Sequence, residues 1–149
     1  MGNLDPLLEH AESLRNVALA DFNRAVARRD GARAQAHDLA AYRADYVQRW
    51  KARFQLGAAL AIVHCYRQFG DRLELAITQQ AHAVDASEQA LARANDSLVA
   101  HELRVASVRK LMQRRELERA RSGERREQRA TDEFAQRMGM RRAPQGVPT

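Results

Sequence analysis

Apolar residues recur at intervals of seven along both halves of the chain. In the second half this interval selects large side chains, at Ile77, Val84, Leu91, Leu98, Val105 and Met112. In the first half it selects mostly smaller ones, at Leu4, Ala11, Ala18, Ala25, Ala32, Leu39 and Tyr46. A sustained seven-residue repeat is typical of helices that pack side by side in a coiled coil. The pattern therefore predicts two long helices, with a seam of large residues facing a seam of small ones.

The two seams also predict where the chain folds back. An antiparallel pairing that sets Leu39 beside Ile77 places the reversal near residue 58, next to Gly57. Glycine readily adopts the left-handed backbone conformation that ends a helix. We therefore predict an all-α fold, a long antiparallel two-helix coiled-coil hairpin that is monomeric when isolated. The first helix is expected at about 4–56 and the turn near 57–58.

The second helix is expected to be much longer, at about 59–138. Pro6, Pro144 and Pro148 all lie near the ends of the chain, so proline interrupts neither helix. A candidate break lies at 70–71, because Asp71 follows a glycine and could cap a new helix.

The same register leaves the end of the second helix without a partner. Because Met112 is placed beside Leu4, residues from Gln113 onward project past the start of the first helix. We predict a C-terminal helical overhang that is poorly ordered in the free protein. Residues 1–142 form one stalk domain in this interpretation, and 143–149 form a disordered tail.

Composition argues against a compact enzyme. Charged residues make up 30% of the chain and aromatic residues only 5%, which leaves little material for a globular core. The net charge is +6, and residues 113–142 hold ten Arg and six Asp or Glu of alternating sign. An Arg-rich coiled coil that binds RNA is a remote alternative, but Phe134 is the one aromatic residue in this segment on which a base could stack. We expect no nucleic-acid partner.

Sequence signatures of catalysis are not found. The chain has no phosphate-binding glycine loop, no HExxH, no CxxC and no GxSxG motif, and its five histidines are scattered. Cys65 is the only cysteine, which excludes an internal disulfide. We therefore expect no enzyme activity, no cofactor and no metal site.

The hydropathy pattern predicts a cytoplasmic protein. The longest apolar stretch, residues 56–65, is far shorter than the ~20 residues that span a bilayer. We expect no direct membrane insertion, so that any membrane association goes through a partner protein.

Two short runs share spacings of four, three and four residues. The first run contains Gln35, Leu39, Tyr42 and Tyr46, and the second contains Phe69, Leu73, Ala76 and Gln80. Antiparallel pairing brings these eight residues together near the turn, and we call them the turn-end patch. A stripe at helical spacing is often hairpin core. A two-helix hairpin buries only a narrow seam, however, so the aromatic members could instead form an exposed docking surface.

A second candidate surface lies on the overhang. We call it the overhang surface, and it consists of Arg129, Asp132, Glu133, Phe134, Gln136, Arg137 and Met138. Phe134 and Met138 are four residues apart and share one helix face. The segment is either a solvated, frayed helix end or a surface whose apolar pair docks into a socket on another protein.

These residues resemble a known family. The charged stretch with Asp-Glu-Phe-Ala-Gln-Arg, within residues 125–142, is similar to the C-terminal signature of the FliJ family of flagellar type III export proteins. The turn-end patch is similar to the family's Q-x3-L-x2-Y-x3-Y and F-x3-L-x2-A-x3-H patterns, with Gln80 in place of the histidine. The resemblance implies a non-catalytic stalk, similar to the central rotor subunit of rotary ATPases.

The resemblance also implies the partners and the place of action. The overhang surface is expected to bind the flagellar export ATPase hexamer and promote its assembly. The turn-end patch is expected to bind the membrane export-gate protein, and flagellar export chaperones are further partners. The stalk would then act at the export apparatus, peripheral to the inner membrane, in flagellum assembly and motility. The nearer alternative is the equivalent stalk of a virulence-type (injectisome) type III secretion ATPase.

Overall fold

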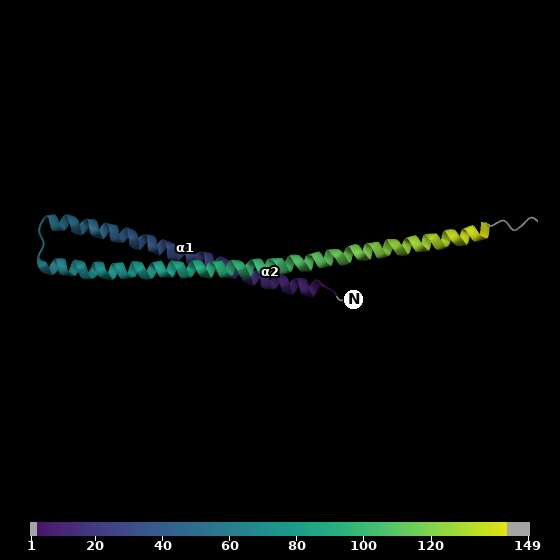
Figure 1. Ribbon diagram of the computed structural model, residues 1–149, viewed down its shortest axis with the longest axis horizontal. Coiled ribbons are helices and arrows are strands. Elements are labelled where there is room, and N and C mark those ends of the chain that lie inside the picture. Colours follow the sequence, from purple (N-terminus) through teal and green to yellow (C-terminus); the bar gives the residue numbers. More distant parts are fainter. Residues whose placement is uncertain (1–2, 143–149) are drawn as a thin grey trace, which may run out of the picture.

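The protein is a rod made of two antiparallel helices (Figure 1). The computed structural model describes residues 3–142, in which α1 spans Asp5–Gln55 and α2 spans Leu60–Arg142. No strand occurs in this part of the chain. With 51 residues in α1 and 83 in α2, the helices are about 75 Å and about 125 Å long at a rise of 1.5 Å per residue. The predicted all-α two-helix hairpin is confirmed.

The ends of α1 are fixed by local hydrogen bonds. The Asp5 backbone N–H donates to Oδ1 of Asn3 over 3.1 Å. Pro6 lies in the first turn, where backbone N–H groups have no acceptor within the helix, so the missing N–H of proline costs no hydrogen bond. At the other end, the N–H groups of Leu56 and Gly57 each donate over 3.1 Å to the carbonyl three residues earlier. Gly57 then adopts a φ of +88°, which the absence of a Cβ makes accessible. The chain therefore reverses at the predicted glycine.

Every position of the two seven-residue ladders is buried or half-buried between the helices. The fully buried residues are Ala11, Ala18 and Ala25 of α1 and Leu73, Leu98, Val105 and Val108 of α2. Small residues of α1 thus face larger residues of α2, as the seams predicted, and Ala11 packs against Val105 and Val108. The buried seam is narrow, so we expect a free energy of unfolding near the low end of the ~5–15 kcal/mol range.

Ion pairs between the two helices are consistent with the same antiparallel register. Three guanidinium groups contact carboxylates across the seam: Arg109 with Glu12 at 3.0 Å, Arg33 with Glu88 at 2.6 Å, and Arg43 with Glu74 at 2.8 Å. All six side chains remain a third or more exposed. Such pairs contribute only ~0–1 kcal/mol each. They help to specify the alignment of the helices, while the apolar seam provides most of the stability.

The second helix differs from the expectation in several respects. It begins at Leu60, runs unbroken through 70–71 and ends at Arg142, so the candidate break and the expected end near residue 138 are wrong. A single glycine costs a helix only about 1 kcal/mol. The flanking Phe69 and Leu73 pack toward α1 and hold the helix there. The predicted tail, 143–149, lies outside the described residues.

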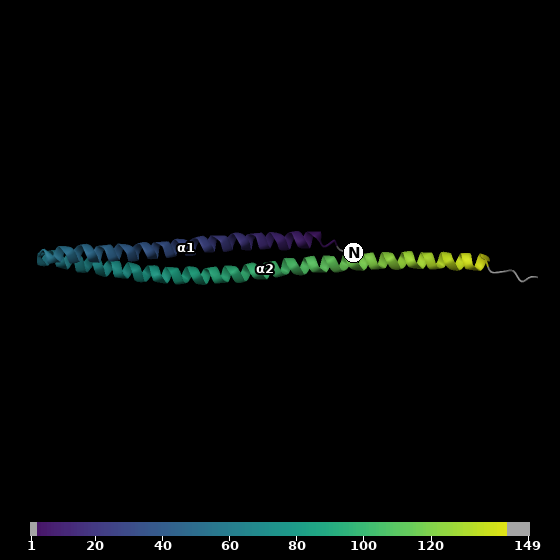
Figure 2. The ribbon, with the colours of Figure 1, turned by 90° about the horizontal axis from the view of Figure 1, so that it is seen from above.

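The overhang is a continuous helix instead of the poorly ordered segment that we expected. In two perpendicular views, α2 continues well beyond the point at which α1 begins (Figures 1 and 2). Every side chain from residue 113 to 141 is exposed. The rod therefore has a closed end at the turn and a single-helix end at the C-terminal side.

Candidate functional sites at the two ends of the rod

The turn-end patch divides into core and surface. Leu73 is buried, and Leu39, Tyr46, Ala76 and Gln80 are half-buried. The members that face solvent are Gln35, Tyr42 and Phe69, of which Tyr42 is 52% exposed and Phe69 is 41% exposed. The core interpretation thus fits the buried and half-buried members, whereas the exposed members remain a candidate docking surface. The exposed members are the ones available to a partner.

Tyr46 is the structural centre of the patch. Its ring centroid lies 4.9 Å from that of Phe69 and 5.3 Å from that of Tyr66, and its hydroxyl donates a 3.3 Å hydrogen bond to the Tyr66 backbone carbonyl. Burial raises the pKa of the Tyr46 phenol, and the neighbouring Tyr66 and Tyr42 add to the shift. Tyr46 is therefore neutral at physiological pH and ties the two helices together.

Sequence reasoning missed part of the cluster. Trp50, Phe54 and Tyr66 extend it to the turn, with ring centroids 5.2 to 5.5 Å apart. The Arg53 guanidinium lies 5.3 Å from the Trp50 ring centroid, at a distance that allows a cation–π contact. The signal was present in the sequence, because Tyr42, Tyr46, Trp50 and Phe54 recur every four residues. Six of the eight aromatic residues of the chain thus gather at the turn end.

Gln80 uses its side-chain amide inside the hairpin. Its Nε2 donates a 2.9 Å hydrogen bond to the backbone carbonyl of Ala32 on α1. That bond fixes the half-buried amide between the helices at the far edge of the turn-end patch. Gln80 therefore helps to position the patch, whichever partner the patch binds.

The overhang surface is fully accessible. Phe134 is 66% exposed and Met138 is 37% exposed, and all the other members are also exposed. A side-chain hydrogen bond of 3.1 Å joins Gln128 to Asp132 one turn later. Arg129 and Glu133, although four residues apart on one helix face, form no ion pair with each other in the part of the chain that the structure describes.

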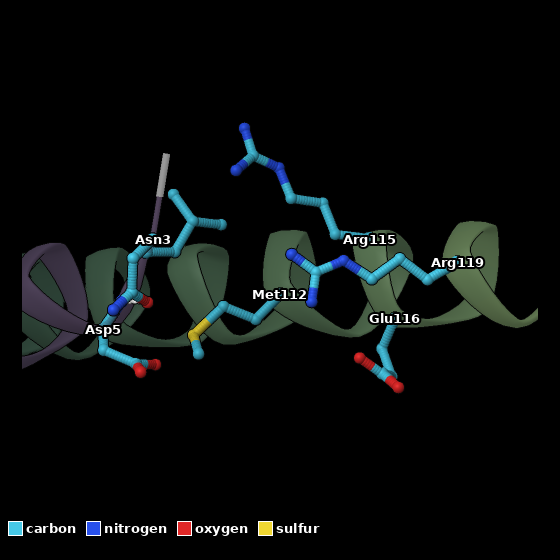
Figure 3. Close-up of a pocket in the computed structure, with 7 residues that line it drawn as sticks. Asn3, Asp5, Met112, Arg115, Glu116 and Arg119 are labelled. Atoms are coloured by element: carbon cyan, nitrogen blue, oxygen red, sulfur yellow. Dashed lines mark hydrogen bonds between the residues drawn. The ribbon is translucent and has the colours of Figure 1, made fainter. Parts of the chain in front are cut away.

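A shallow cleft of about 210 Å³ marks the point at which the overhang begins (Figure 3). It is lined by Asn3, Leu4, Asp5, Met112, Arg115, Glu116 and Arg119. Figure 3 shows Arg119 reaching back along α2 toward Met112. The seven-residue series that is apolar up to Met112 continues as Arg119, Arg126 and Glu133. The seam residues of α2 thus change from apolar to charged at the point beyond which α1 no longer covers α2. The overhang therefore lacks the apolar stripe against which a second helix could pack.

Within residues 3–142, no three His, Cys, Asp or Glu side chains are grouped so that they could hold a metal ion. The helices of this same range are also not long and apolar enough to cross a membrane.

The fold and its two ends define a class of protein, an extended α-helical hairpin that presents different surfaces at its two ends. The family model described as "Flagellar FliJ protein" matches residues 1–144, and the chain belongs to the FliJ family. It is thus associated with flagellar type III protein export, as the resemblance implied. No curated protein and no solved structure matches the chain.

Proposed function

We propose that the chain is a non-catalytic coupling stalk of the flagellar export apparatus. The overhang enters the export ATPase hexamer and promotes its assembly, and the turn end contacts the membrane export-gate protein. Flagellar export chaperones bind the stalk. It acts in the cytoplasm, peripheral to the inner membrane, and needs no cofactor. The observation that carries this proposal is the helical overhang of residues 113–142, whose Phe134 and Met138 are exposed without cover from α1.

The shape of the overhang suits insertion into a ring. A single helix is about 10–12 Å wide with its side chains, and thirty residues extend about 45 Å. Phe134 and Met138 supply an apolar anchor, while Arg129 and Arg137 can pair with acidic groups on the ring. Exposed aromatic anchors surrounded by polar residues are typical of interface hot spots.

Assembly requires contacts that favour the ring over single subunits. A stalk can promote hexamer formation only if the overhang contacts adjacent subunits more favourably in the ring than it contacts one subunit alone. A helix that touches two neighbouring subunits at once meets this condition. Because α2 is continuous from Leu60 to Arg142, a tilt or rotation imposed on the overhang is transmitted to the turn end.

At the turn end, Tyr42 and Phe69 are the proposed contacts with the export gate. Their ring centroids lie 6.4 Å apart on different helices, so they form one exposed aromatic surface. Gln35 adds an exposed amide on the same helix as Tyr42. The buried Leu73 and the half-buried Tyr46 hold this surface in place.

Capture of the export ATPase tests the proposal. The full chain and a variant truncated after Met112 are compared as baits for purified ATPase, and hexamer formation is followed against stalk concentration. We expect truncation to abolish capture and Phe134→Ala to raise the stalk concentration needed for assembly by about tenfold or more. Leu103→Ala is the matched control, because Leu103 is 64% exposed on the paired part of α2. Full capture and stimulation by the truncated chain would refute the proposal.

A further inference from the structure

The apex of the hairpin is apolar and open to solvent. Residues 56–61 read Leu-Gly-Ala-Ala-Leu-Ala and include the turn. Leu56 is 89% exposed and Leu60 is 85% exposed, more than any other large apolar side chain in the described residues. The turn that carries them lies at the extreme end of the rod, opposite the overhang (Figure 1). Two leucines are therefore presented at a protruding tip.

The apex is flanked by cations and by no carboxylate. Between residues 46 and 70 the chain has four cationic residues, Arg49, Lys51, Arg53 and Arg67, and no Asp or Glu. Arg49 forms a 3.0 Å ion pair with Asp45, just outside this range. In the described part of the chain, the other three cations are exposed and form no ion pair. The tip thus carries three uncompensated positive charges.

Amphipathic aromatic side chains lie behind the apex. Trp50 and Tyr66 pack with ring centroids 5.5 Å apart, and both are half-buried. Trp50 is six residues from Leu56, which is about 9 Å along a helix. Tryptophan and tyrosine are enriched where an apolar phase meets water, because one part of the ring system is apolar and another can hydrogen-bond.

The start of α2 adds a further apolar surface beside the tip. A shallow hollow runs along its first two turns, lined by Leu60, Ala61, Val63, His64 and Arg67. Three of its five lining residues, Leu60, Ala61 and Val63, are apolar, and Arg67 is the lining residue farthest along α2 from the turn. The apolar surface therefore continues from the apex toward the cations.

We propose that this tip docks on the surface of an anionic phospholipid bilayer. Leu56 and Leu60 enter the acyl boundary, while Lys51, Arg53 and Arg67 contact headgroup phosphates. Along the rod the order is leucines, then cations and aromatic rings, which matches the order of acyl chains and headgroups across a bilayer surface. Interfacial elements enter to a depth of about 5–10 Å, which is comparable with the distance from Leu56 to Trp50.

A lipid surface fits the tip better than a protein socket does. The apex is convex, and between its two leucines lie only Gly57, Ala58 and Ala59, which offer little shape for a specific socket to recognise. A bilayer accepts a convex apolar tip of any shape, and anionic headgroups complement the three unpaired cations. This proposal goes beyond the coupling function and does not depend on it. It departs from the sequence expectation that only a partner protein connects the chain to a membrane, because the sequence alone did not show that Leu56 and Leu60 are almost fully exposed.

Vesicle binding by the full chain tests the proposal, with Trp50 as the probe because it is the only tryptophan. Phosphatidylcholine vesicles containing about one quarter phosphatidylglycerol should shift the Trp50 emission to the blue, and added salt should weaken the binding. Pure phosphatidylcholine vesicles should bind about 100-fold more weakly, because each of three cations contributes about fivefold.

Variants locate the contact. Leu56→Ser and Leu60→Ser should each weaken vesicle binding about tenfold, since each removes a leucine side chain from the acyl boundary. Both residues are almost fully exposed, so the helix content by circular dichroism should stay unchanged. Leu103→Ser, at a 64% exposed position far from the tip, should bind like the natural chain. The proposal is overturned if anionic vesicles do not bind, if they bind without shifting Trp50 emission, or if Leu103→Ser weakens binding as much as Leu60→Ser does.

Discussion

Alanine at Tyr46 and at Tyr42 should separate the core of the turn-end patch from its docking surface. The Tyr46 ring is half-buried and packs within 4.9 to 5.3 Å of Phe69 and Tyr66. Tyr42 is 52% exposed, and its nearest ring centroids are 6.4 and 6.5 Å away. Replacing a fully buried aromatic residue by alanine costs about 3–5 kcal/mol of stability. Because Tyr46 is only half-buried, we expect Tyr46→Ala to lower the free energy of unfolding by about 2–3 kcal/mol. Tyr42→Ala should cost less than about 1 kcal/mol.

The loss of binding to the export gate should be larger for Tyr42→Ala than for Tyr46→Ala, the opposite of the order expected for the loss of stability. Tyr42→Ala keeps the fold and removes an exposed anchor, so it should weaken gate binding by about tenfold or more. Unfolding is measured by urea titration with circular dichroism, and gate binding by calorimetry at a temperature at which both variants are folded. In folded samples, the loss of gate binding should be larger for Tyr42→Ala than for Tyr46→Ala.

Two results would refute this reasoning. If Tyr42→Ala destabilises the hairpin as much as Tyr46→Ala does, the exposed ring belongs to the core. If folded Tyr42→Ala binds the gate normally, the turn-end patch is not the docking surface. Leu75→Ala is a suitable control, because Leu75 is 58% exposed on α2 outside the aromatic cluster.

Three further predictions follow from local structure. Gly57→Ala should lower the free energy of unfolding by about 1 kcal/mol, because Gly57 has a positive φ that alanine adopts only with strain. Gly70→Ala should raise the free energy of unfolding by up to ~1 kcal/mol, because Gly70 lies within a helix and has open space where a Cβ would be. Urea titration measures both changes. Because the pKa of Tyr46 is raised above 10.0, the folded state holds this proton more tightly than the unfolded state does. That contribution to stability is complete below about pH 10 and is lost as the pH rises through the folded-state pKa. Tyr46→Phe should therefore make the loss of stability above pH 10 less steep in pH-dependent unfolding. In the free protein, amide hydrogens of residues 113–142 should exchange much faster than those near Val105, because no second helix protects the overhang; a mass-spectrometric exchange series checks this, and equal rates would contradict it.

The hairpin could be predicted because one repeat determines it. The seven-residue ladders specified the seam, setting Leu39 beside Ile77 gave the register, and Gly57 marked the reversal. The overhang followed from the same register, which sets Met112 beside Leu4 while the helical pattern continues to about residue 138. The candidate break at 70–71 was wrong because local propensity at a glycine is weak compared with the packing of Phe69 and Leu73 on either side.

The candidate sites were less predictable. Spacing placed Tyr42 and Phe69 in the turn-end patch, but it could not tell exposed members from buried ones, because both lie close to the seam. The wider aromatic cluster was missed because Trp50 and Tyr66 lie outside the two matched runs. The exposure of Leu56 also depends on the exact end of α1, which sequence patterns locate only to within a few residues.

The most direct test of the proposed coupling role is hydrogen exchange of the full stalk with and without the export ATPase. The proposal predicts that, when the hexamer forms, exchange slows across residues 113–142, most of all around Phe134, and changes little in the paired helices near Val105. Phe134→Ala should reduce this protection at equal stalk and ATPase concentrations. Unchanged exchange across 113–142, under conditions in which the stalk still stimulates the ATPase, would contradict insertion of the overhang into the ring.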